Sequence, residues 1–109
     1  MQVPLEITFR GMAHSTFVDV AVAAWLERLS QVCDRIQRCH VRIDLPHRRR
    51  HGLPFEVKLT LAVPGTDSVV VQAENTDVYL AIADAFLAAR RRLQELARMR
   101  RGEVKRHAA

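Results

Sequence analysis

The longest regular pattern in the chain lies between Thr76 and Arg101, where apolar residues recur at steps of three and four. Seven positions form the stripe: Val78, Ile82, Ala85, Phe86, Ala89, Leu93 and Leu96. This spacing places one apolar face along a helix of 3.6 residues per turn. The sequence therefore predicts an amphipathic helix over 76–101, docked on a core, with Arg91 and Arg98 directed to solvent.

A second amphipathic helix is predicted from about residue 16 to about residue 33. Its stripe consists of Val18, Val22, Trp25, Leu29, Val32 and Ile36. Ser15 or Thr16 can cap its start, because a hydroxyl there accepts a hydrogen bond from a free backbone N–H. Asp19 then falls in the first turn, where the helix dipole favours a negative charge.

Four further segments alternate between apolar and polar residues, which is typical of half-buried strands. They cover residues 5–10, 39–45, 55–63 and 68–74. Gly11 ends the first segment. Pro64 and Gly65 fit the two central positions of a type II turn between the last two strands. Asn75 or Thr76 is expected to cap the helix that follows.

The predicted order is β-α-β-β-β-α, which indicates an α+β fold. We expect a four-stranded sheet whose last three strands form an antiparallel meander, with both helices packed on one face. The other face would expose His40, Arg42, Lys58, Thr60 and Gln72. Residues 1–101 are expected to form one domain, and residues 102–109, which lack apolar periodicity, a flexible basic tail.

The charge balance favours a polyanionic partner. Lys and Arg number 17 against 12 for Asp and Glu, so the formal net charge is +5, and 15 of the 17 cations are arginine. The planar guanidinium matches phosphate oxygens, so nucleic acid or a ribonucleoprotein is the expected partner. The run 47–51 is either a solvated hairpin loop or an accessory phosphate-binding loop through Arg48, Arg49 and Arg50.

Other classes of function find little support in the sequence. The chain has no glycine-rich phosphate loop, nucleophile elbow or His-Glu-x-x-His pattern, so we expect no enzyme, cofactor or small-molecule substrate. Cys33, Cys39 and His40 do not match a common zinc spacing, and Cys39 falls on the buried phase of its strand. Without a signal peptide or an apolar span of about 18 residues, we expect a cytoplasmic protein without a membrane partner. Trp25 is expected in the core, with base stacking as the alternative.

Several motifs resemble one protein family. The segment VPGTDSVVVQAENTDVYLAIADAF, running to AARRRLQELARMRRGEVK, and the opening MQVPLEITFRGM are similar to the ribosome hibernation promoting factors. These are also called ribosome-associated inhibitors, ribosomal subunit interface proteins or sigma-54 modulation proteins. The chain resembles a short form, particularly the variants that precede a cold-shock domain. The matching motifs are Pro64-Gly65, Asp77-x-Tyr79, Ile82 and ARRRL at 89–93.

The resemblance implies a fold akin to the double-stranded-RNA-binding domain. It also implies binding to the small ribosomal subunit, through 16S rRNA and nearby ribosomal proteins, in the mRNA/tRNA channel. Translation would be blocked sterically in stationary phase or stress, without a cofactor, by a monomer or weak dimer. Arg28 and Arg91 match basic family positions, and the full set of candidate rRNA contacts is Arg28, Arg42, Lys58, Arg90, Arg91, Arg98 and Arg101.

The first helix departs from the family pattern, because Ala21, Ala23, Trp25 and Gln31 stand where basic residues are frequent. Two alternatives therefore remain open. A general RNA-binding module is one, although such domains open their second helix with lysines, and 76–78 is neutral to acidic. A protein-interaction domain that has lost ribosome binding is the other.

Overall fold

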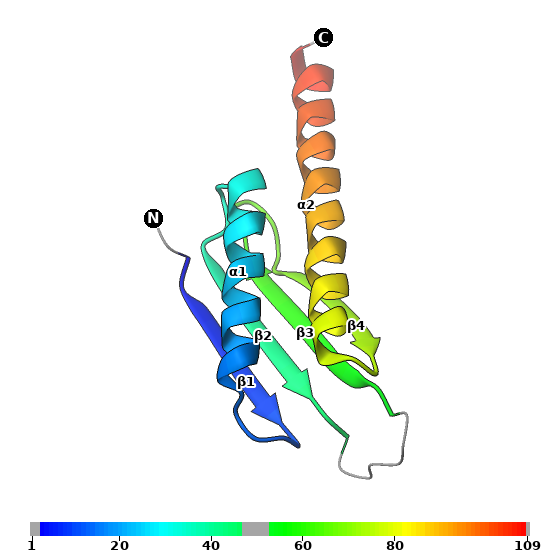
Figure 1. Cartoon of the computed structure of the whole chain (residues 1–109). Coiled ribbons are helices and arrows are strands. Elements are labelled where there is room, and N and C mark those ends of the chain that lie inside the picture. The colour runs from blue at the N-terminus through cyan, green and yellow to red at the C-terminus, as the bar shows by residue number, and fades with distance from the viewer. Residues whose placement is uncertain (1–2, 47–52, 109) are drawn as a thin grey trace.

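The computed structural model describes the backbone of residues 3–46 and 53–108, and side chains as far as residue 102. The elements are β1 (Leu5–Arg10), α1 (Thr16–Val32), β2 (Arg38–Asp44), β3 (Phe55–Ala62), β4 (Val69–Asn75) and α2 (Val78–Ala108). The predicted order β-α-β-β-β-α is confirmed (Figure 1).

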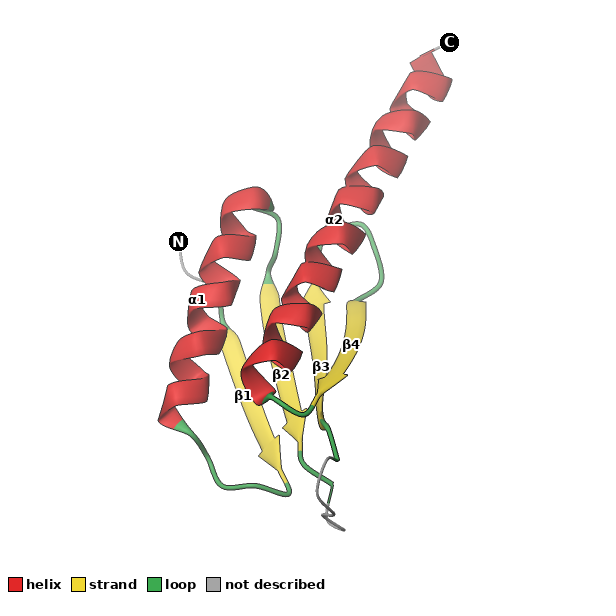
Figure 2. Ribbon diagram, turned by 45° about the vertical axis from the view of Figure 1, so that its right-hand side comes forward, coloured by secondary structure: helices red, strands yellow, loops and turns green. Residues whose placement is uncertain are grey.

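The four strands form one sheet in the order β1-β2-β3-β4. β1 pairs with β2 in parallel, and β2, β3 and β4 form the predicted antiparallel meander. The sequence alone did not show which strand β1 pairs with. Because α1 carries the chain back along the sheet, β2 can start at the same end as β1 and run beside it. Both helices lie on one face and run in the same direction (Figure 2).

The core lies between the sheet and the two helices. Strand residues that face the helices are buried, among them Val41, Ile43 and Leu59, each fully shielded from solvent. Phe86 and Ile82 of α2 belong to the same buried cluster and pack on these strand residues from the helix side. Each such aliphatic or aromatic side chain contributes about 1.5–3 kcal/mol through the water it releases. Most positions of the two predicted apolar stripes face this core, but Val32 is 53% exposed, and Leu26, which the predicted stripe did not include, is buried.

Two glycines adopt the left-handed backbone conformation. Gly65 has φ 80°, as the predicted type II turn requires. Gly11 has φ 75°, and a Cβ atom at this position would collide with the backbone carbonyl oxygen of Leu45. The turn after β1 thus needs glycine for both its dihedral angle and its close approach to the chain beyond β2.

The start of α1 agrees with the sequence, but the start of α2 does not. Ser15 Oγ accepts a hydrogen bond from the Val18 backbone N–H at 3.3 Å, so the predicted cap is confirmed. The cap of α2 is Asp77, not Asn75 or Thr76. Asp77 Oδ1 accepts bonds from the backbone N–H groups of Tyr79 and Leu80 at 2.9 and 3.4 Å. Asn75 Oδ1 in turn accepts from the Asp77 N–H at 2.9 Å, which shapes the turn before the helix.

The end of α2 also differs from the prediction. The backbone of 102–108 is helical, whereas the sequence predicted a flexible tail after residue 101. A helix that is already formed gains one hydrogen bond with each added residue, and this offsets the cost of about 1 kcal/mol for Gly102. The mobility of this segment stays a prediction. Among the described residues, no helix combines the length and apolar character needed to cross a membrane.

Candidate nucleic-acid interface

The C-terminal half of α2 carries the densest positive charge that the structure describes. Between residues 90 and 101 there are six arginines and one acid, Glu95. Ala89 and Leu93 are buried, which fixes the rotation of the helix. Four of the candidate residues are exposed on this half and are called here the arginine ridge: Arg90, Arg91, Arg98 and Arg101.

Pairing with carboxylates does not neutralise the arginine ridge. Glu95 bonds with Arg92, at 3.5 Å between Oε2 and Nη1, and not with Arg98. Both arginines are three residues from Glu95, so spacing alone could not choose between them. No ion pair among the described residues involves a member of the ridge. Its guanidinium groups therefore keep their donors available for a ligand.

The ends of the two helices converge on a groove of about 1100 Å³. The end of α1, the loop after it, the β3–β4 turn and residues 90–101 of α2 line this groove. Its cations are Arg35, Arg90, Arg98, Arg100 and Arg101, and its acid is Asp34. Arg35 and Arg100 were not among the candidates from the sequence. Both helices run in the same direction, so the residues after α1 lie beside residues 90–101 of α2, which brings Arg35 into the groove. Periodicity along the chain carries no signal for this contact.

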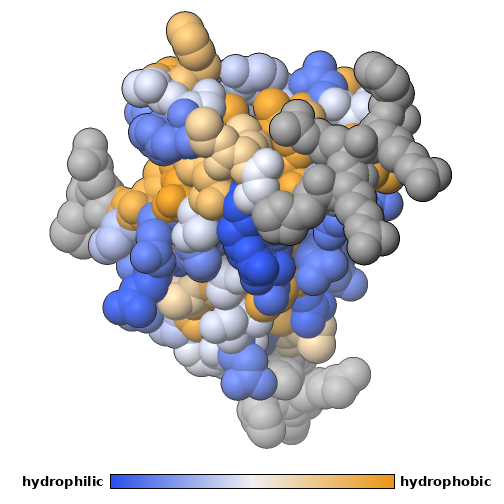
Figure 3. Space-filling model, turned by 90° about the horizontal axis from the view of Figure 1, so that it is seen from below, coloured by the Kyte–Doolittle hydropathy of each residue, from blue (hydrophilic) through white to orange (hydrophobic). Residues whose placement is uncertain are grey.

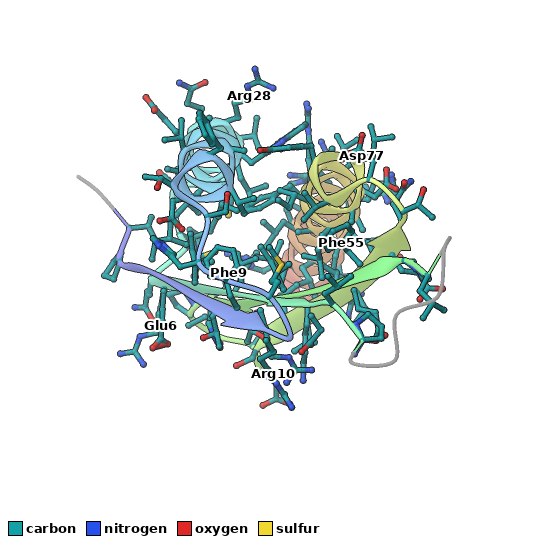
Figure 4. The ribbon with its side chains drawn as sticks, turned by 60° about the horizontal axis from the view of Figure 1, so that its bottom comes forward. Glu6, Phe9, Arg10, Arg28, Phe55 and Asp77 are labelled. Carbon is teal, nitrogen blue, oxygen red and sulfur yellow. The ribbon has the colours of Figure 1, made fainter. Side chains whose placement is uncertain are left out.

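Arg28 is the one cation in the sequence of α1, and an aromatic ring supports it. Its Cζ lies 5.1 Å from the centroid of Trp25, one helical turn earlier. Trp25 is half-buried and stacks on Phe86 of α2, with centroids 6.1 Å apart and planes 17° from parallel. Figure 4 shows Arg28 projecting from the helix layer into solvent. The predicted packing of Trp25 is confirmed, and the ring also supports a surface cation.

Arg42 and Lys58 lie on the open face of the sheet, opposite the helices. Asp44 binds two arginines there: Arg42 Nε at 3.0 Å and Arg10 Nε at 3.3 Å. This face carries as many acids as cations. The cations are Arg10, Arg38, Arg42 and Lys58, and the acids are Glu6, Asp44, Glu56 and Glu74. The seven candidates therefore occupy two faces, and only the helix side has an excess of arginine. Arg48, Arg49 and Arg50 lie outside the described residues.

The first halves of the helices present apolar side chains to solvent. Phe17 is 80% exposed and Val20 67% on α1, while Leu80 is 53% exposed on α2. Figure 3, which views the end where the helices begin, shows hydrophobic residues at the surface on the helix side. Val70 and Leu87 are 48% and 40% exposed. Positive charge on the helix layer is thus confined to its other end.

The two cysteines show no sign of a metal site. Cys39 is fully buried, as predicted, and burial raises the pKa of its thiol to about 12. Its reactive thiolate is therefore disfavoured at neutral pH. Cys33 is half-buried at the end of α1. Within the part of the chain that the structure describes, no three His, Cys, Asp or Glu residues come together to hold a metal ion.

Comparison with protein families gives a direct match over the whole of this fold. Residues 5–101 match the family described as "Sigma 54 modulation protein / S30EA ribosomal protein". The chain belongs to this family. The match confirms the resemblance seen in the sequence. It spans both helices, the four strands and the arginine ridge.

Solved structures support the fold independently. A ribosomal subunit interface protein from Coxiella burnetii is similar with a TM-score of 0.76 at 19% identity, over 87% of this chain and 98% of that one. The N-terminal domain of Protein Y from Thermus thermophilus has a TM-score of 0.70 at 21% identity, over 88% of this chain and 99% of that domain. No curated protein matches the sequence. At these identities the likeness establishes the arrangement of strands and helices.

Proposed function

We propose that this protein binds the small ribosomal subunit through its helix layer and inhibits translation in stationary phase or under stress. The observation that carries the proposal is the arginine ridge on α2, whose members form no ion pair among the described residues. Membership of a family described as containing a ribosomal protein supports a ribosomal partner. A cytoplasmic location follows from the same proposal.

The proposed mechanism is steric and needs no cofactor or catalytic residue. Guanidinium groups of the ridge pair with phosphates of 16S rRNA and release counterions, which drives binding. Arg28 adds a contact from α1, and Arg35 and Arg100 extend the basic surface at the groove. Seated in the mRNA/tRNA channel, the domain excludes messenger and transfer RNA. Such contacts position the protein on the backbone of the RNA and do not require a particular base sequence.

A double charge reversal on α2 tests the binding surface. Arg91→Glu together with Arg98→Glu should abolish co-sedimentation with purified 30S particles, because two attractive phosphate contacts become repulsive. Both side chains are exposed, so the fold should remain intact by circular dichroism.

The matched control reverses the same amount of charge on the sheet face. Arg38→Glu together with Lys58→Glu should sediment with 30S particles nearly as well as the wild type. Loss of binding only in this control would move the interface to the sheet, with Arg38 or Lys58 among the contacts. Unchanged sedimentation of the α2 variant would exclude the ridge.

One rival proposal has structural support of its own. The exposed apolar residues at the start of the helices, led by Phe17, suit a protein partner or self-association better than a phosphate backbone. Analytical ultracentrifugation of the pure protein examines this. A stable dimer that Phe17→Ser dissociates, with no 30S binding, would favour the rival. For a general RNA-binding module, tight binding to random duplex RNA in a gel shift would be expected instead.

A further inference from the structure

Phe86, Trp25 and Arg28 form a series of flat side chains, called here the ladder, that leads from the core to the surface between the helices. Phe86 is buried, Trp25 stacks on it, and the Arg28 guanidinium lies over Trp25. Trp25 is half-buried and Arg28 is exposed. The guanidinium carbon of Arg28 thus lies over the indole, and Figure 4 shows the Arg28 side chain reaching into solvent.

The indole of Trp25 favours one position of the Arg28 guanidinium before any ligand arrives. A cation within about 6 Å of an indole centroid gains roughly 0.5–1 kcal/mol at an exposed site. The described residues place no carboxylate in an ion pair with Arg28. A preorganised guanidinium loses less entropy on binding than a free one. The side of the Arg28 guanidinium that faces away from Trp25 is therefore a flat surface that is already positioned for a ligand.

We propose that an unpaired nucleobase of the bound RNA stacks on the outer face of Arg28, with Trp25 and Phe86 supporting it from behind. Guanidinium planes and aromatic rings are the surfaces on which splayed-out bases stack in RNA complexes. The inference rests on the proposed function, since the RNA is that of the small subunit, and it names the feature of RNA that α1 recognises. α1 then contributes a base contact where it lacks the charge for several phosphate contacts.

The position of the ladder beside the arginine ridge suits this role. The helices run in parallel, and Trp25 meets Phe86, so Arg28 lies near the level of Ala89. The ridge begins at the next residue, Arg90. A strand whose phosphates follow the ridge can therefore direct a base towards Arg28. A phosphate contact alone would need the charge of Arg28 but not the ring beneath it.

A charge-conserving substitution separates stacking from simple charge. Arg28→Lys keeps the positive charge and loses the plane, so its affinity for 30S particles should fall roughly 5- to 100-fold. Arg91→Lys, the matched control on the ridge, should change affinity by about twofold or less, because lysine also binds phosphate. Thermal unfolding of both variants checks that the fold is retained.

The single tryptophan provides a second readout. Trp25 is the one Trp in the chain, so its fluorescence reports on this site alone. A short oligoadenylate should change the emission of Trp25, and an abasic strand of equal length should not. Equal responses to both strands, or equal 30S affinity of Arg28→Lys and wild type, would overturn the proposed stacking.

The same measurements distinguish this inference from the proposed function. If the wild type binds 30S particles and Arg28→Lys binds equally well, the ribosomal proposal stands and the base site does not. Another result is that the wild type does not bind 30S particles, while oligoadenylate changes the emission of Trp25 and the abasic strand leaves it unchanged. In that case the base site stands and the ribosomal proposal fails.

Discussion

The arginine side chains have the same chemistry but three different surroundings in the structure. Arg42 is bound to Asp44 on the sheet face, Arg28 lies over Trp25, and Arg91 is exposed without an ion pair among the described residues. An exposed ion pair contributes no more than about 1 kcal/mol, yet it occupies the donors that a phosphate would use. The candidate contacts therefore differ less in their charge than in whether their N–H donors are available to bind a phosphate.

At the residue scale, Cys39 should make stability depend on alkaline pH. Burial raises its thiol pKa from 9.0 to about 12, so above pH 9 the unfolded chain loses a proton that the folded chain keeps. The contribution is fully present below pH 9 and is lost as pH rises towards about 12, by at most ~1.4 kcal/mol per pH unit. Urea unfolding at several pH values should show the stability advantage of wild type over Cys39→Ala shrinking in this window. Parallel pH profiles for the two proteins would contradict the assignment.

At the element scale, α2 performs two tasks along its length. Its first part docks on β3 and β4 through buried residues that end at Leu93, with Leu96 half-buried beyond. Its later part projects past the sheet, as Figures 1 and 2 show. The arginine ridge begins on the docked part of α2 and continues onto the projecting part. A helix anchored at one end can thus hold cations outward with little loss of backbone entropy on binding.

This division predicts that the end of α2 contributes little to folding. A chain that stops after Gly102 should have a free energy of unfolding within about 0.5 kcal/mol of the full chain, because the buried stripe remains intact. Urea unfolding measures this. Circular dichroism at 222 nm should lose helical signal over the same truncation. A drop of several kcal/mol would mean that residues 103–109 pack against the domain.

At the scale of the whole molecule, the two broad faces differ in charge. Cations and acids are equal in number on the sheet face, whereas the later part of the helix layer is strongly basic. Like charges gathered on one side raise the local potential and attract a polyanion to that side. The proposed orientation, with the helices towards RNA, rests on this asymmetry.

The asymmetry predicts a steep salt dependence. If about five arginines of the helix layer contact phosphates, affinity for 30S particles should fall roughly several hundred-fold between about 50 and 200 mM salt. Replacing Arg91 with Ala should reduce the slope of log affinity against log salt by about one. Fluorescence titration at several salt concentrations gives both values. A flat salt response would favour an apolar interface around Phe17.

The sequence alone determined the order of elements, most of the two apolar stripes and the strand alternation, because these depend on local periodicity. What it left open or got wrong were local choices between near-equal neighbours. Asp77 instead of Asn75 or Thr76 caps α2, and Glu95, which is three residues from both Arg92 and Arg98, pairs with Arg92. In each case several side chains satisfy the spacing, and the geometry of one turn selects among them.

The tertiary structure decided which residues share a face. Arg42 and Lys58 belong to strands and face away from the helices, so they cannot join a surface with Arg91. Arg35 joins the basic groove because the loop after α1 lies beside residues 90–101 of α2, and Trp25 meets Phe86 across 61 positions of sequence. Periodicity fixes which side of an element is buried, but only the packing of elements against one another brings distant side chains into one site.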